Sequence, residues 1–141
     1  MDDTIYRVLS PYKGRVILCL ETAADYMMLS NGVVYQDRFR VFATAPIHDS
    51  DITVFLLSEE EFANKQTIEY AGMVCTSPVQ TILDLLSYYD IVDDQTIYES
   101  LANYYYRHGE LFDEIIPLMS EEQLRVFEKY KQDAIDYYTE A

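Results

Sequence analysis

The sequence contains no tryptophan, two histidines, two cysteines, four glycines and four prolines among 141 residues. With so few chain breakers and an apolar content of 50%, it is not a disordered acidic tail, and we expect it to fold by itself. No run approaches the roughly 20 apolar residues that cross a bilayer. Cys19 and Cys75 stand far apart inside apolar stretches, which predicts two reduced core residues and excludes a disulfide framework.

Export signals are also missing at the amino terminus. Residues Met1 to Ile5 have no basic group, and no long apolar run follows them. We therefore expect a cytoplasmic protein without membrane contact.

Basic residues are scarce, with 10 lysines and arginines against 25 acids and a net charge of −15. The chain through Tyr70 holds 11 acids and 6 bases, whereas the chain from Ala71 holds 14 acids and 4 bases. Such a surface repels phosphate, which argues against direct nucleic-acid binding, and it attracts a protein partner with a basic surface. The same charge also aids solubility, so both uses stay open.

The first half of the chain predicts strands and one early helix. Ile5–Leu9 and Val16–Leu20 are short apolar runs typical of extended segments, with a turn at Ser10–Gly14 between them. Glu21–Leu29 has helix-forming composition, and Ser30-Asn31-Gly32 supplies a helix stop.

Between Val33 and Thr76 alternate residues are apolar, which predicts strands of one antiparallel sheet. The alternation is clearest at Phe39–Ala43 and Ile52–Leu57. Glu59–Lys65 predicts a polar loop or a single turn, and Tyr70–Cys75 predicts a returning strand.

The strongest local signal is a helix start at Ser77. Ser77 can accept the Gln80 amide while the Gln80 side chain returns to the Ser77 amide, and Pro78 suits the first helical position. The expected buried positions are Ile82, Leu85, Leu86 and Tyr89, and the expected outward positions are Thr81, Asp84 and Tyr88.

Two longer helices are predicted downstream. The first spans about Gln95–Arg107, between the acids Asp93 and Asp94 and the stop at Gly109. We expect Ile97, Leu101, Tyr104 and Tyr105 to face inward, and Glu99, Asn103 and Tyr106 to lie nearer the solvent.

After a segment from Glu110 to Met119 that Pro117 interrupts, Ser120 and Gln123 form a second capping motif. The last helix runs toward Tyr138. Its expected buried positions are Leu124, Phe127, Ala134 and Tyr138.

Strands with one early helix, then a block of three to four helices, indicate an α+β fold. We expect a single domain over 1–141, with a strand-rich half at 1–76 and a helical half at 77–141.

No catalytic motif is present, so we expect a protein that is not an enzyme and that needs no cofactor. His48 lies in an Asp-rich loop, where a weak metal site and a solvated loop are the two interpretations, and we predict no metal. His108 suits a helix-end role. Ser77 lacks the Gly-x-Ser-x-Gly turn, and neighbouring acids such as Asp113-Glu114 diverge rather than converge.

Tyrosine is abundant, with 14 copies. Tyr104-Tyr105-Tyr106 point around a helix in three directions, so at least one ring reaches the surface, where tyrosines either anchor interfaces or fill the boundary of the core. We name as candidate partner-binding residues the acids and tyrosine along this part of the chain: Asp93, Asp94, Glu99, Tyr106, Glu110, Asp113 and Glu114.

Two stretches resemble the AbiEi-type antitoxins of type IV toxin–antitoxin systems, which act in abortive infection. In Gly14–Leu29 an extended run leads to a small-residue helix, and in Met73–Leu86 a strand and capped turn lead to a helix with an apolar pattern around Thr81 and Asp84. Ile97–Arg107 and Leu124–Tyr138 are similar to the trailing helices of the family.

Family members pair a basic winged-helix domain, used for autorepression, with a carboxy-terminal domain that counteracts a nucleotidyltransferase toxin. The resemblance begins near Gly14, with nothing before Ile5 to form a winged helix, so it implies the antitoxin domain alone. Val79-Gln80 stands where the family usually has an acid followed by a base. The resemblance thus implies the protein-facing role rather than repression.

We therefore expect a non-enzymatic protein that neutralises or regulates a protein partner, such as a nucleotidyltransferase toxin. The alternative is a phage or mobile-element inhibitor, similar to an anti-CRISPR protein, whose acids mimic nucleic acid and block a basic groove. The partner's identity and the oligomeric state do not follow from these patterns.

Overall fold

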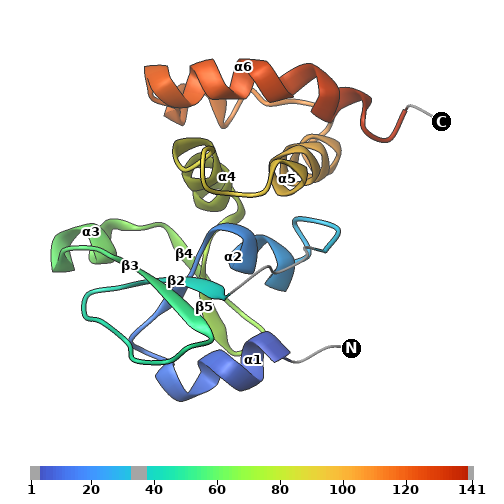
Figure 1. Cartoon of the computed structure of the whole chain (residues 1–141). Helices are drawn as coiled ribbons and strands as arrows, with labels where there is room; N and C mark the ends of the chain where they lie inside the picture. Colours follow the sequence, from blue (N-terminus) through green and yellow to red (C-terminus); the bar gives the residue numbers. More distant parts are fainter. Residues whose placement is uncertain (1–3, 33–37, 140–141) are drawn as a thin grey trace.

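A five-stranded sheet lies between the amino-terminal helix on one side and the carboxy-terminal helical block on the other (Figure 1). The computed structural model describes residues 4–32 and 38–139, so the predicted strand start at Val33 falls outside the described residues. The mixed fold with a late helical block matches the expected class. In the order β3-β2-β1-β5-β4, the strands are β1 (Ile17–Leu18), β2 (Phe39–Ala43), β3 (Ile52–Leu56), β4 (Thr67–Tyr70) and β5 (Met73–Thr76).

The sheet is mixed, so the prediction of an antiparallel sheet was wrong. β1 pairs antiparallel with β2 and parallel with β5, and β2 and β3 are parallel, with Phe39 opposite Ile52. Residues 44–51 return the chain to the start of the neighbouring strand, and Ile47 packs on the core there. Alternation tells which face of the sheet a residue occupies, but the connection determines strand direction.

The first predicted strand is a helix. α1 (Thr4–Leu9) and the 3₁₀ turn η1 (Ser10–Tyr12) cover one side of the sheet (Figure 1). Leu9 is fully buried there, and Ile5 and Val8 pack against the same cluster, which is the spacing of a helix face. A run of five residues is too short to distinguish this spacing from the alternation of a strand.

The predicted early helix is α2 (Leu20–Tyr26), which stops before Leu29 because Met28 adopts a left-handed φ of 60°. The predicted loop at Glu59–Lys65 is instead helical, as α3 (Glu59–Asn64). Ser58 Oγ accepts the Glu61 amide at 3.1 Å and the Ser58 amide donates to the Glu61 carboxylate at 3.0 Å. This capping box stabilises a helix whose sequence is mostly polar.

The predicted strand Tyr70–Cys75 is divided between two strands of a hairpin. Ala71 and Gly72 both have positive φ, of 47° and 85°. Two consecutive positive φ values make the tight turn that joins antiparallel strands, so the chain reverses here instead of running straight.

The helical half begins as predicted. It contains α4 (Pro78–Ser87), α5 (Asp94–Arg107), the 3₁₀ turn η2 (Ile116–Leu118) and α6 (Glu121–Asp136). Ser77 Oγ accepts the Gln80 amide at 3.1 Å, but the Gln80 side chain contacts Gln66 and Asp84 rather than the Ser77 amide. Both halves of the second predicted capping box form, between Ser120 and Gln123.

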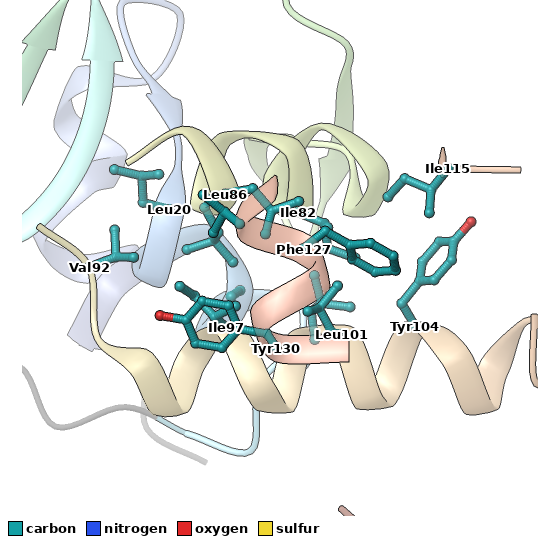
Figure 2. Packing of buried hydrophobic residues seen from close by; sticks show 14 of the residues in the cluster. Leu20, Ile82, Leu86, Val92, Ile97, Leu101, Tyr104, Ile115, Phe127 and Tyr130 are labelled. Carbon is teal, nitrogen blue, oxygen red and sulfur yellow. The ribbon is translucent and has the colours of Figure 1, made fainter. Parts of the chain in front are cut away.

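One hydrophobic cluster joins the sheet to the helical half. Figure 2 shows Phe127 of α6 beside Ile82 of α4 and Leu101 of α5, and all three are buried. Phe42 of β2 belongs to the same cluster, which ties the two halves together. Cys19 is also buried in it, and Cys75 is buried on the other side of the sheet, both as free thiols, as predicted.

On several helices the buried face differs from the predicted one. Tyr89, Leu124 and Tyr138 are exposed rather than buried, and Tyr105 is only partly buried, whereas the outward-predicted Thr81, Asp84, Glu99 and Asn103 are buried. These four polar side chains all hydrogen-bond inside the protein, which lets them replace apolar side chains on the buried face. None of the described helices combines the length and apolar character needed to cross a membrane.

We predict that Phe127→Ala lowers the free energy of unfolding by about 3 to 5 kcal/mol, because it removes a fully buried ring and leaves a cavity. Leu124→Ala, three residues away on the exposed side of α6, changes it by about 0.5 kcal/mol at most. Equilibrium urea unfolding measures both. Equal losses in the two variants would contradict the described packing of α6.

Candidate protein-binding surface

The seven predicted partner-binding residues do not form one patch. Asp93 and Asp94 lie at the start of α5, whereas Glu110, Asp113 and Glu114 follow its end. Because α5 has 14 residues, the two groups are about 20 Å apart along the helix. The candidate residues therefore divide into an amino-terminal and a carboxy-terminal group.

Glu99, from the middle of α5, belongs to neither group, because only 7% of it is exposed. Its carboxylate accepts hydrogen bonds from the Asn31 amide at 2.9 Å and from the Tyr137 hydroxyl at 2.8 Å. Tyr106 is partly buried, and its hydroxyl donates to the Ile135 carbonyl at 2.5 Å. Both side chains hold α5 to neighbouring segments, so neither belongs to an exposed acidic patch.

The amino-terminal acids also have internal roles. Asp94 accepts a 2.7 Å hydrogen bond from the Tyr130 hydroxyl, and burial together with this carboxylate raises the pKa of Tyr130. Asp93 accepts from the Thr96 hydroxyl at 3.3 Å in the first turn of α5. Asp94 therefore joins α5 to α6, whereas the Asp93 carboxylate contacts the first turn of α5.

The carboxy-terminal group lies in a continuous acidic segment, residues 110–122. It contains five acids and no base, and all five acids are exposed: Glu110, Asp113, Glu114, Glu121 and Glu122. Leu111 and Leu118 are 53% and 58% exposed in the same segment. Charged and apolar groups thus face the solvent together, a combination found at protein interfaces.

Two buried residues anchor the acidic segment. The Phe112 ring lies 4.9 Å from the Tyr105 ring and 5.0 Å from the Phe127 ring, and Ile115 is fully buried. Gly109 and Glu110 both take left-handed φ values, of 68° and 61°, which end α5 and turn the chain outward. The segment is therefore held against the core while its charged side chains point outward.

No ion pair within the described part of the chain includes an acid of the acidic segment. The ion pairs there are Lys13–Glu69, Arg40–Glu21 and Lys65–Asp84. An exposed anionic surface of this kind attracts cationic proteins over a range of about 10 Å at 0.1 M salt.

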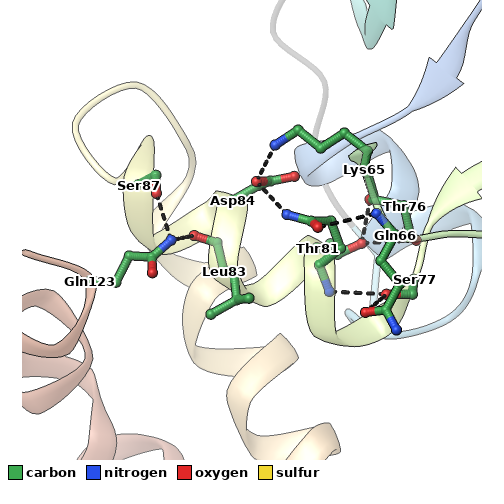
Figure 3. Close-up of polar contacts among 10 residues, drawn as sticks. Lys65, Gln66, Thr76, Ser77, Thr81, Leu83, Asp84, Ser87 and Gln123 are labelled. Carbon is green, nitrogen blue, oxygen red and sulfur yellow. Dashed lines mark hydrogen bonds and ion pairs between the residues drawn. The ribbon is translucent and has the colours of Figure 1, made fainter. Parts of the chain in front are cut away.

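The buried carboxylate of Asp84 has a structural role instead (Figure 3). Its Oδ1 accepts from Lys65 Nζ at 2.8 Å and from Gln80 Nε2 at 3.0 Å, while Oδ2 has no hydrogen-bond partner among the described residues. Burial raises the pKa of Asp84, and the Lys65 ammonium opposes that rise. The pair joins α4 to the segment between α3 and β4.

The two histidines lie in different parts of the described structure. The His108 ring stacks on Tyr104 with its Nδ1 2.8 Å from the Tyr104 carbonyl, which is the predicted helix-end role, and His48 is exposed in a separate loop. Burial raises the pKa of the Cys75 thiol to about 12, which disfavours the reactive thiolate. Among residues 4–32 and 38–139, no three His, Cys, Asp or Glu side chains are grouped to hold a metal ion.

No protein-family model matches this chain, and no curated protein matches it.

We predict that Lys65→Met destabilises the protein by about 3 kcal/mol at pH 7, because it leaves the Asp84 charge buried without a cation. The loss shrinks as the pH falls from 7 toward 4, since protonation removes that charge. The double variant Lys65→Met/Asp84→Asn is more stable at pH 7 than Lys65→Met alone. Urea unfolding at several pH values tests this, and a pH-independent loss would contradict it.

Proposed function

We propose that this chain is a non-enzymatic binding domain that neutralises a basic protein partner through its acidic segment, residues 110–122. The observation that carries the proposal is the exposure of five acids and two leucines on a segment whose acids form no ion pair with a described base. The acids would steer a cationic partner, and Leu111 and Leu118 would supply apolar contact area.

We further propose that the domain is a cytoplasmic antitoxin of the AbiEi type and that its partner is a nucleotidyltransferase toxin. Support comes from the Met73–Leu86 stretch that carries the resemblance, in which β5 leads through the Ser77 cap into α4. Enzymes that handle nucleotides or nucleic acid present cationic groups to phosphate. An anionic, partly apolar surface is complementary to a cationic groove of this kind of enzyme, and binding there would exclude the nucleotide or nucleic-acid substrate.

Co-expression with a nucleotidyltransferase toxin of a type IV system tests the proposal. We expect the unaltered chain to restore growth of cells that produce the toxin and to co-purify with it. Asp113→Lys/Glu114→Lys abolishes both effects. The matched control, Glu128→Lys/Asp133→Lys, changes the net charge equally at exposed positions of α6 and keeps both effects. The proposal would be contradicted if the unaltered chain did not restore growth. It would also be contradicted if both variants lost growth rescue and co-purification equally.

The salt dependence of binding distinguishes this function from nucleic-acid mimicry. A mimic binds almost entirely by charge, so its complex dissociates near 1 M salt, where the screening length is about 3 Å. We expect the complex of this chain to weaken but persist at that salt, because contacts of Leu111 and Leu118 are not screened. Leu118→Ala should then dissociate it at 1 M salt. Size-exclusion chromatography measures each case, and complete dissociation of the unaltered complex at 1 M salt would favour the mimic.

A further inference from the structure

Three carboxylates are buried in the described structure, and one lacks a cation. Glu21, Asp84 and Glu99 are 8%, 4% and 7% exposed. Glu21 pairs with Arg40 at 3.1 Å and Asp84 with Lys65 at 2.8 Å. No described lysine, arginine or histidine lies within 4 Å of Glu99. A buried charge without a counterion is costly, so Glu99 stands apart.

Neutral donors occupy the Glu99 carboxylate instead. Oε1 accepts from the Asn31 amide at 2.9 Å, and Oε2 accepts from Gln95 Nε2 at 3.1 Å and from the Tyr137 hydroxyl at 2.8 Å. The hydrogen bond to this carboxylate raises the pKa of Tyr137. Tyr137 lies just after α6, so the last turn of the chain supplies one of the donors.

Tyr138, the next residue, donates to acceptors beside Glu99. The Tyr138 hydroxyl donates to Asn103 Oδ1 at 2.5 Å and lies 3.3 Å from Asn31 Oδ1. One carboxylate and two amide oxygens thus accept hydrogen bonds from the hydroxyls of Tyr137 and Tyr138. These acceptors come from α5 and from the loop after α2, which lies on the same side of the molecule as the carboxy-terminal turn (Figure 1).

Tyr137 and Tyr138 form a tyrosine turn after α6 that is held by these hydrogen bonds and by packing of the partly buried Tyr137 against the hydrophobic cluster. Tyr138 is exposed, and its ring meets Tyr106 edge-on at 5.7 Å. Hydrogen bonds of this kind each contribute about 0.5 to 1.5 kcal/mol net, and terminal segments open at lower free energy than the core. The turn can therefore leave while the core of α4, α5 and α6 stays folded.

We propose that Glu99, Asn103 and Asn31 form a binding site for an arginine side chain of a protein partner, and that Tyr137 and Tyr138 occupy this site in the free chain. A guanidinium carries five donors in one plane, which suits a carboxylate flanked by amide oxygens, and it supplies the missing cation. The site lies away from the acidic segment and goes beyond the proposed function, because it requires neither a toxin nor the acids of residues 110–122.

Titration of the full chain with N-acetyl-arginine amide, followed by amide NMR shifts, tests the proposal. We expect Tyr137→Phe/Tyr138→Phe to bind this probe about tenfold more tightly than the unaltered chain, because the competing hydroxyl donors are gone while the rings remain. Shifts should centre on Asn31, Glu99 and Asn103. The control Tyr89→Phe, at an exposed tyrosine on another surface, leaves the affinity unchanged.

Adding Glu99→Gln to the double variant should abolish binding, and the uncharged citrulline analogue should not bind. Any of three results would overturn the proposal. The double variant could bind no more tightly than the unaltered chain, binding could survive Glu99→Gln, or N-acetyl-lysine amide could bind as well as the arginine probe. Circular dichroism checks that each variant is folded. If the double variant unfolds, Tyr137→Phe alone must still bind more tightly than the unaltered chain, and failure to do so overturns the proposal as well.

Discussion

The packing of α4 between the sheet and the last two long helices is the contact on which the rest of the molecule depends. Ile82, Leu85 and Leu86 of α4 are buried in a cluster that reaches from Phe42 in the sheet to Phe127 in α6. This contact gives the helical half apolar surface in common with the sheet. The anchors of the acidic segment belong to the same cluster, so the position of the candidate surface follows from core packing.

Electrostatics divides the acids of this chain into two populations. Glu21 and Asp84 are buried beside Arg40 and Lys65 and connect elements that the hydrophobic cluster alone would not orient. The acids of residues 110–122 are exposed. Because water and salt screen their mutual repulsion, concentrating them on one segment costs little free energy. Glu99 belongs to neither population, because it is buried among neutral donors, and this exception is what points to a site beneath the tyrosine turn.

Local signals predicted much of the helical half. The Ser77 and Ser120 caps and the Pro78 start depend on side chains only three residues apart, so they are visible in the sequence. The two cysteines are free and buried, as predicted, and the acids Glu110, Asp113 and Glu114 are exposed. The α3 capping box was visible in the same way, at Ser58 and Glu61, but the polar composition of that helix favoured a loop.

By itself, the sequence determined the charge distribution, the helix starts, the mixed fold class and the lack of catalytic motifs, because these depend on composition and short-range spacing. Only the tertiary structure decided the strand directions, the helical state of α1 and the burial of Glu99 and Asp84, because each depends on residues distant in the chain. Glu99 and Tyr137 are 38 positions apart, and no local pattern connects them.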